Sequence, residues 1–418
     1  MSEKRNIVLI TLDSVRADHC SFMGYHRETT PNIDRMAREG LYFENAIAPS
    51  VPTGPSIFGV FTGEYCPIGG VDFSEKKWRK EFKRRKTLAE VLSQKGYNTS
   101  AIHPHPYASA IYGFNKGFKY FDNFVQKGQI ESMKGSKISS LIVSLRKIIL
   151  KEGTALPWEK FYGKILEWVE SCEKPYFLWV FLLDTHTPYF PPKKKWCDLS
   201  YWELAYLFWK INRRGWKSGS RAEIEKIKNA YDDAIHYADE FVGRLWEDLE
   251  DDDPIFVIHA DHGDGLGEHG FYRHPLLLYE ELIHVPLVIY NANVEGRINK
   301  PISLLGLAPT ILELIGEDNE FSSESFLHGG RDWVISKVFE GEKRKIAVRT
   351  EDWKFITGQE EEDELYYLKK DLYEQENVID NHKDLLKEMR NIVKKHMKHE
   401  REVERIKETI PKIRGKYK

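Results

Sequence analysis

Two carboxylates in this chain directly follow apolar, strand-like segments: Asp13 after residues 6–12 and Asp261 after residues 255–260. His262 comes next, so the second strand end offers oxygen and nitrogen donors together. Carboxylate oxygens and imidazole nitrogens are ordinary ligands of divalent metal ions. The two strand ends therefore predict a metal site that contains Asp13, Asp261 and His262.

A hydroxyl residue, Thr53, lies between these strand ends in the sequence and shortly before Pro55, where a helix is expected to begin. The unpaired N–H groups and the positive dipole end at a helix start favour an anion. A metal site combined with an anion site and a hydroxyl suggests hydrolysis of an anionic ester. Phosphate, phosphonate and sulfate esters all belong to that chemical class.

The elements that must position these residues alternate between strand-like and helical patterns. Such alternation predicts an α/β fold with a doubly wound, largely parallel sheet flanked by helices. Ligands of such sheets bind at the carboxyl ends of the strands, where Asp13 and Asp261 are expected to lie. The strands are expected at residues 6–12, 99–102, 176–183, 255–260 and 285–290, and the principal helices at 87–94, 161–171 and 221–249.

The pattern divides the chain into a catalytic α/β domain, residues 1–335, and a small C-terminal α+β subdomain, residues 336–418, that ends in a charged helix. Residues 126–158 and 193–220 interrupt the first domain as insertions rich in basic, apolar or aromatic side chains. Such amphipathic insertions typically pack on their own domain or on a second copy. The alternative is a lid that meets a membrane surface or an amphiphilic substrate.

Composition limits the choice of partner and compartment. The 418 residues carry 62 Lys and Arg against 65 Asp and Glu, and a net charge of −3 gives no pull toward nucleic acid. The 4 cysteines show no CxxC spacing, which favours a reducing compartment. No segment has the run of about 18 apolar residues that a membrane span needs. We therefore expect a cytoplasmic protein, with its oligomeric state left open.

Several short motifs are spread over most of the chain. They are residues 6–18 (NIVLITLDSVRAD), 30–34 (TPNID), 53–63, 186–189 (HTPY), 260–270 (ADHGDGLGEHG), 285–287 (VPL) and 308–310 (APT). In this order the motifs resemble the sulfatase family of the alkaline phosphatase superfamily, and the resemblance continues into a C-terminal region at residues 348–377.

The resemblance implies an alkaline phosphatase-like fold and a metal held by Asp13, Thr53, Asp261 and His262. Many sulfatases carry a second acid after the first, and this chain has Ser14 there. The reduced ligand set is similar to that of phosphonate and phosphodiester hydrolases of the superfamily. A mixture of oxygen and nitrogen donors suits Mn²⁺ or Zn²⁺, with Ca²⁺ or Mg²⁺ as alternatives.

Thr53 also stands where the family places its nucleophile. Sulfatases convert a Cys or Ser in a C/S-x-P-x-R motif to formylglycine, but alignment on Thr62 and Gly63 puts Thr53 at that position and Ile57 in place of the Arg. A second register that starts at Ser50 lacks the Arg as well. We therefore expect no formylglycine and a direct attack by the Thr53 hydroxyl.

Histidines complete the expected site. By resemblance, His186 and His274 would bind the substrate and act as proton donors or acceptors. His105 is expected either to contact the substrate or to support the metal residues. Arg16 and Asp18 are expected to brace the metal loop, and Lys354 is a weaker candidate for reaching the site from the C-terminal subdomain.

Three functions follow from these residues. The principal expectation is a metal-dependent hydrolase of phosphoesters, phosphodiesters or phosphonates with Thr53 as nucleophile. The alternative is a sulfuric ester hydrolase, and the second alternative is a noncatalytic, sulfatase-like anion-binding protein. The expected partner is a small anionic ester on a glycan or lipid headgroup, not a nucleic acid, and a peripheral membrane contact is left open.

Overall fold

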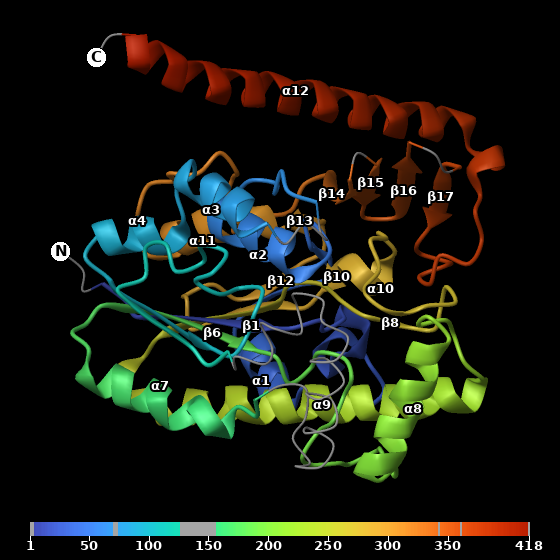
Figure 1. Ribbon diagram of the computed structural model, residues 1–418, viewed down its shortest axis with the longest axis horizontal. Coiled ribbons are helices and arrows are strands. Elements are labelled where there is room, and N and C mark those ends of the chain that lie inside the picture. The colour runs from blue at the N-terminus through green and yellow to red at the C-terminus, as the bar shows by residue number, and fades with distance from the viewer. Residues whose placement is uncertain (1–3, 70–73, 126–155, 342, 360–361, 417–418) are drawn as a thin grey trace.

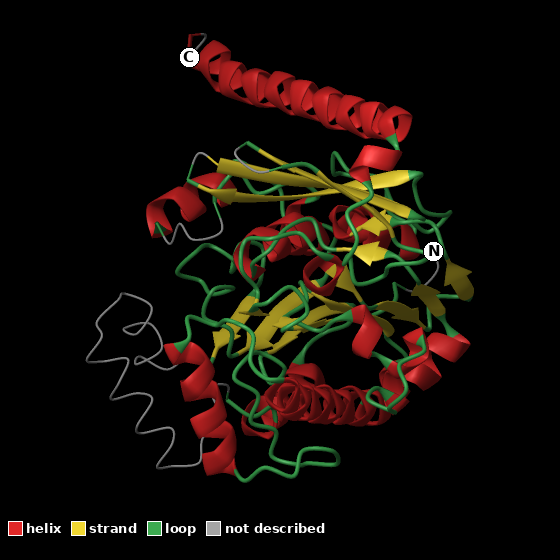
Figure 2. Cartoon of the chain, turned by 90° about the vertical axis from the view of Figure 1, so that its right-hand side faces the viewer, coloured by secondary structure: helices red, strands yellow, loops and turns green. Residues whose placement is uncertain are grey.

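The computed structural model describes residues 4–69, 74–125, 156–341, 343–359 and 362–416. The expected insertion at residues 126–158 therefore lies almost entirely outside the described residues. Within the described chain, a central sheet is covered by helices on both faces, and a smaller sheet with the last helix lies beyond one layer (Figure 1). The same order of layers is seen from the side in Figure 2.

The central sheet has eight strands in the order β12-β2-β11-β7-β1-β6-β4-β5. β1 lies in the middle and pairs in parallel with β6 and β7, so the expected doubly wound parallel core is confirmed. The strands are β1 (Ile7–Leu12), β2 (Leu41–Phe43), β4 (Asn98–His103), β5 (Tyr120–Asn123), β6 (Tyr176–Leu182), β7 (Ile255–Ala260), β11 (Leu287–Tyr290) and β12 (Gly296–Ile298).

One expected strand, residues 285–290, is divided in the structure. Pro286 has no N–H to donate to a sheet and separates β10 (His284–Val285) from β11. β10 pairs with β3 (Ala46–Ile47), whereas β11 runs antiparallel to β7. The central sheet is consequently mixed, which the apolar pattern alone does not show.

Two layers of helices cover this sheet (Figure 1). Ser220 begins the longest one below the sheet with a capping box in which its hydroxyl accepts from the N–H of Glu223. The helices below are α1 (Pro31–Glu39), α7 (Glu159–Ser171) and α9 (Arg221–Asp248). Those above are α2 (Thr53–Thr62), α3 (Glu75–Lys83), α4 (Leu88–Gln94) and α11 (Leu307–Leu314).

The expected insertion at residues 193–220 contains helix α8 (Tyr201–Arg213). Its inner face packs on the domain through Leu204, Leu207, Phe208 and Ile211, which are buried. Its outer face exposes Trp202, Tyr206 and Trp209. Packing on the domain therefore explains the apolar residues of the inner face. Contact of the outer face with a membrane or a second copy stays a prediction.

The C-terminal region forms an antiparallel sheet of four strands, with the last helix lying across it (Figure 1). Met389 on that helix is buried against Ile335, Val348 and Phe355 of the sheet. The opposite side of the sheet contributes Val338 and other residues to the core of the main body. The elements are β14 (Trp333–Glu340), β15 (Lys343–Thr350), β16 (Trp353–Gly358), β17 (Glu364–Tyr367) and α12 (Lys383–Lys416).

The remaining short elements are β8 (Gly265–Leu266), β9 (Tyr272–Arg273), α10 (Glu280–Ile283) and β13 (Ile302–Ser303). All four cysteines are free thiols. Among the described helices, none combines the length and apolarity required to cross a bilayer.

Candidate active site

The two expected metal carboxylates come together because their strands are paired in register. Leu12 at the end of β1 lies opposite Ala260 at the end of β7, so Asp13 and Asp261 leave the sheet side by side. Both carboxylates are fully buried. One ligand atom each from Asp13, Asp261 and His262 lie within 4.8 Å of one another, which is close enough to surround one metal ion.

The Asp261 carboxylate is oriented by hydrogen bonds to one of its two oxygens. The N–H groups of Ser14 and His262 both donate to Asp261 Oδ1, at 3.0 and 2.9 Å. Asp261 Oδ2 accepts no hydrogen bond, although it is buried. An unpaired oxygen of this kind is costly unless something positive binds it, so the donor set fits a divalent metal ion.

His262 contributes nitrogen to the same point. Its Nδ1 lies 2.8 Å from the carbonyl oxygen of Gly263, so Nδ1–H donates there and the Nε2 lone pair is left unprotonated. Thr53 Oγ1 lies 3.2 Å from that Nε2. Thr53 begins α2, whose positive dipole end favours the anionic form of a ligand or of the hydroxyl itself.

The surroundings shift the pKa values of the two carboxyl groups in opposite directions. Burial alone would raise the pKa of Asp13, but His186, His105 and His262 hold it well below its ordinary value. Burial and the neighbouring charge of Asp13 raise the pKa of Asp261 to about 6, against the opposing effect of His262. Two carboxylates this close repel one another, which a bound cation would relieve.

The geometry favours one of the two roles that the sequence left open for His105. The N–H groups of Tyr107 and Ala108 donate to its Nδ1, so Nε2 carries the proton and donates to Asp13 Oδ2 at 2.9 Å. Its ring is buried and stacks on Phe181 with centroids 4.4 Å apart. Both nitrogens are occupied, so the geometry supports the positioning role rather than substrate contact.

His186 and His274 lie on the open side of the cluster, with their ring centroids 5.2 Å apart. The His274 ring is 4.5 Å from that of His262, and its Nδ1 lies 3.0 Å from Asp264 Oδ1. His186 Nδ1 donates to the carbonyl oxygen of Thr187 at 2.6 Å. In both rings Nε2 is the nitrogen left for a substrate. Burial lowers the pKa of both histidines, to about 4 for His186.

Several supporting residues were not anticipated from the sequence. Ser14, with φ 59°, donates its hydroxyl to Asp13 Oδ1 at 2.7 Å, and Ser56 donates to the carbonyl oxygen of Asp261 at 2.6 Å. Asp264 accepts from His274 and from the Tyr189 hydroxyl. In the sequence, only its position two residues after His262 could have indicated that Asp264 lies near the site.

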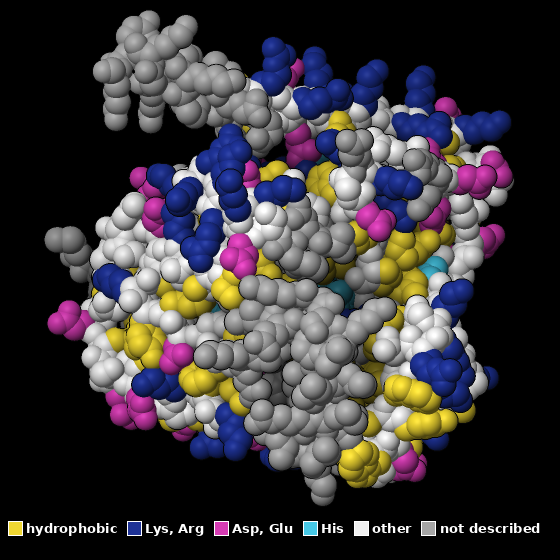
Figure 3. Space-filling view, viewed as in Figure 1, with side chains coloured by type: hydrophobic (Ala, Val, Ile, Leu, Met, Phe, Trp, Pro, Cys, Tyr) yellow, Lys and Arg dark blue, Asp and Glu magenta, His cyan; other side chains and the backbone are white. Residues whose placement is uncertain are grey.

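Thr53, His186 and His274 line one cavity of about 750 Å³. Hydrophobic side chains and histidines are visible in the hollow at the middle of the face shown in Figure 3. The cavity walls are largely aromatic, with charged side chains at Arg273, Glu340 and Lys345. The aromatic residues are Trp78, Tyr107, Tyr112, Trp216, Phe271 and Tyr272.

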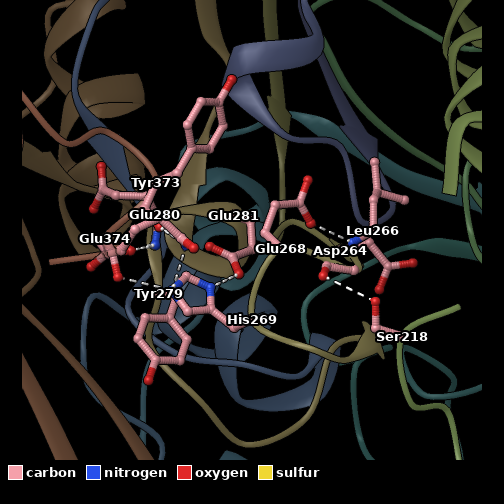
Figure 4. A network of polar contacts seen from close by, with 12 residues as sticks. Ser218, Asp264, Leu266, Glu268, His269, Tyr279, Glu280, Glu281, Tyr373 and Glu374 are labelled. Carbon is pink, nitrogen blue, oxygen red and sulfur yellow. Dashed lines mark hydrogen bonds and ion pairs between the residues drawn. The ribbon is translucent and has the colours of Figure 1, made fainter. Parts of the chain in front are cut away.

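His269 and Lys354 belong to a different network, which connects the C-terminal region to the main body. His269 Nδ1 lies 2.6 Å from Glu281 Oε1, and the ring stacks on Tyr279 (Figure 4). Lys354 is buried and pairs with Glu280 and Glu374 at 3.0 and 2.9 Å. Lys354 thus stabilises a contact between the two parts and does not line the cavity.

Arg16 and Asp18 brace the loop after β1. The guanidinium of Arg16 is buried and pairs with Asp18 at 2.7 Å and with Glu268 at 2.9 Å. These contacts join the loop that contains Asp13 to the loop that follows His262. They agree with a bracing role for both residues.

Comparisons with known proteins place this site in a family. The Sulfatase family model matches residues 5–317, and the chain belongs to this family. An arylsulfatase of Clostridium perfringens is 26% identical, covering 94% of each chain. Human iduronate 2-sulfatase is 25% identical over 70% of this chain and 60% of its own length.

Solved structures show the same fold. A protein in complex with its substrate D-glucosamine-2-N,6-O-disulfate superposes with a TM-score of 0.72 and 19% identity, covering 95% of this chain and 98% of the other. The phosphonate monoester hydrolase of Agrobacterium radiobacter gives 0.70 at 18% identity, covering 95% and 96%. The chain thus has the alkaline phosphatase-like fold and is a hydrolase acting on sulfuric or phosphoric esters.

Proposed function

We propose that this chain is a metal-dependent hydrolase that cleaves the sulfuric ester of an anionic glycan. The observation that carries the proposal is the position of Thr53 Oγ1, 3.2 Å from His262 Nε2 and in the same cavity as His186 and His274. The sulfatase relatives favour sulfur as the central atom over the phosphorus expected from the sequence. A structural neighbour with a sulfated sugar as substrate supports a glycan.

Asp13, Asp261 and His262, joined by Thr53, are the residues that would hold the metal ion. A divalent ion bound there would lower the pKa of the Thr53 hydroxyl and stabilise charge on the ester oxygens. The donor set of carboxylate, imidazole and hydroxyl supports Mn²⁺ or Zn²⁺ over an all-oxygen Ca²⁺ site.

The chain's own groups then divide the reaction into two steps. In the first, the Thr53 hydroxyl gives its proton to a histidine Nε2 as Oγ1 attacks the central atom, the bond to the leaving alcohol breaks, and the same Nε2 passes that proton to the leaving oxygen. His186 and His274 both present Nε2 to the cavity because their Nδ1 atoms are engaged. The helix start at Thr53 adds positive potential where the anion sits.

In the second step, water must attack the central atom of the Thr53 ester, because threonine has no second hydroxyl through which to expel the group. That histidine Nε2 accepts a proton from the attacking water and passes it to Thr53 Oγ1 as the bond between Oγ1 and the central atom breaks. The attack releases the anion and restores the Thr53 hydroxyl. Protons and charges therefore balance over one turnover.

A second candidate is hydrolysis of phosphodiesters or phosphonate monoesters, which was the principal expectation from the sequence. Thr53 itself favours it, since phosphorus esters of an alcohol are broken readily by a second attack at phosphorus. Ile57, without charge, stands where the family motif has an Arg. The fold neighbour that hydrolyses phosphonate monoesters adds support at the level of fold.

One experiment separates the candidates: initial rates on matched 4-nitrophenyl sulfate, phosphate, phosphodiester and phenylphosphonate esters, and on sulfated monosaccharides. Each is assayed after chelation and readdition of Mn²⁺, Zn²⁺, Mg²⁺ or Ca²⁺. Repeated turnover that is fastest on a sulfate and absent in Thr53→Ala supports the proposal. Faster turnover on a phosphorus ester selects the second candidate, and activity that survives chelation and Thr53→Ala rejects both.

A further inference from the structure

Arg273 is the residue next to His274 whose charge the mechanism above does not use. It ends β9, lines the cavity and has φ 69°, a left-handed conformation that is uncommon for a residue with a side chain. Pairing with Gly265 on β8 holds the backbone in place. Such conformations persist where the surrounding structure imposes them, often at ligand sites.

The guanidinium of Arg273 stacks on the Trp216 ring, with Cζ 4.6 Å from the ring centroid. The side chain is only partly exposed, yet within the described part of the chain no carboxylate pairs with it. By contrast, the buried guanidinium groups of Arg16 and Arg349 pair with Glu268 and Glu280. A partly desolvated cation without a counter-ion favours binding of an anion.

The positive charge of Arg273 acts across the cavity. It is one of the influences that lower the pKa of His186 and His274, behind burial, and it opposes the rise that burial produces in the pKa of Tyr107. Arg273 itself lines the cavity, so its charge is within reach of a substrate bound there. Around it, the aromatic walls offer flat apolar faces suited to a sugar ring.

We propose that Arg273 binds a second anionic group of the substrate, a carboxylate or a sulfate on the same sugar that carries the scissile ester. The inference rests on the proposed function and narrows its substrate class to doubly anionic sugars. Trp216 supports the guanidinium from one side, and a guanidinium can donate two parallel hydrogen bonds to one anion. The scissile ester would be bound by Thr53, His186 and His274.

The first test compares substrates that differ by one anionic group: N-acetylglucosamine 6-O-sulfate and glucosamine 2-N,6-O-disulfate. In the wild type, kcat/KM should be higher for the disulfate. Arg273→Met should lower kcat/KM for the disulfate by about 10- to 100-fold, as expected for loss of a charged hydrogen bond, and change that for the monosulfate by less than about 3-fold. Arg273→Lys should recover part of the difference.

A matched control is available in Arg213→Met. Arg213 also stacks on a tryptophan, with Cζ 5.0 Å from the Trp209 ring, but it is exposed on α8 and does not line the cavity. This substitution should leave kcat/KM unchanged for both substrates. An equal loss on both substrates in Arg273→Met would mean that Arg273 binds the scissile group, and it would overturn the inference.

A second test does not depend on turnover. Calorimetric titration of the metal-loaded protein compares glucosamine N-sulfate with N-acetylglucosamine, and glucuronate with glucose. The wild type should prefer the anionic member of at least one pair, and Arg273→Met should lose that preference. Absence of preference in the wild type, or its retention in the variant, contradicts the inference whether or not a sulfuric ester is hydrolysed.

Discussion

Asp264 Oδ1 lies 3.0 Å from His274 Nδ1, and this contact decides which nitrogen of His274 faces the cavity. A carboxylate at Nδ1 keeps the proton there and leaves Nε2 as the atom that meets the substrate. Asp264 is fully buried and also accepts from the Tyr189 hydroxyl, so its orientation is fixed from two sides.

Asp264→Asn should therefore impair catalysis more than binding. An amide can present its NH₂ group to Nδ1 and reverse the tautomer, so we expect kcat to fall by roughly 10²- to 10⁴-fold with a smaller change in KM. Steady-state kinetics on the best substrate measures both. Tyr189→Phe, which keeps the carboxylate, is the control and should retain most of kcat. Similar losses in the two variants would indicate a purely structural role.

Asp261→Asn should remove bound metal as well as activity. The substitution deletes an anionic ligand whose Oδ2 accepts no hydrogen bond, so we expect metal affinity to fall by more than about 100-fold. Metal content after gel filtration, measured by mass spectrometry, reports this directly. His105→Gln, which changes only the partner of Asp13, should weaken binding less. Wild-type metal content in Asp261→Asn would place the metal elsewhere.

Thr53 should be unmodified in the purified protein. Thr53 and Ser50 are each followed two residues later by proline, but neither has the arginine of the formylglycine signal, because Ile57 and Gly54 stand at its position. Intact mass and peptide mapping settle the chemistry. Thr53→Ser should keep measurable turnover through its hydroxyl, whereas Thr53→Ala should lose at least about 10³-fold in kcat. An aldehyde at residue 50 or 53 would refute this expectation.

Glu374 should make stability fall as pH rises. Burial, together with the charges of Glu280 and Glu281 and against the opposing effect of Lys354, raises the pKa of Glu374 from 4.5 to about 8. A carboxyl with a raised pKa in the folded state contributes stability that is complete below about pH 4.5 and is lost as pH rises through about 8.

Glu374→Gln stays neutral and should flatten this dependence. Urea unfolding at several pH values between 5 and 9 gives the free energy of unfolding of both proteins. The wild type should lose stability relative to the variant as pH rises. The exposed Glu376→Gln serves as the control. If the free energy of unfolding depended on pH equally in the wild type and in Glu374→Gln, the pKa of Glu374 would not be raised in the folded protein.

The sequence by itself determined the fold class and the neighbourhood of the metal residues. Buried parallel strands are continuous apolar runs, and the runs ending before Asp13 and Asp261 are found as β1 and β7. In such sheets carboxyl ends share one edge, so the proximity of Asp13 to Asp261 follows from the pattern. His262 needed no further information, because it is adjacent in sequence.

Only the tertiary structure decided what each histidine does. His105 and His274 look equivalent as isolated histidines near strand ends, but the N–H groups of Tyr107 and Ala108 direct His105 to Asp13. Likewise, only the structure shows that Arg273 lies against Trp216 and lines the cavity, with no carboxylate paired to it among the described residues. Roles of this kind depend on distances between residues far apart in the chain, and local sequence patterns carry no record of those distances.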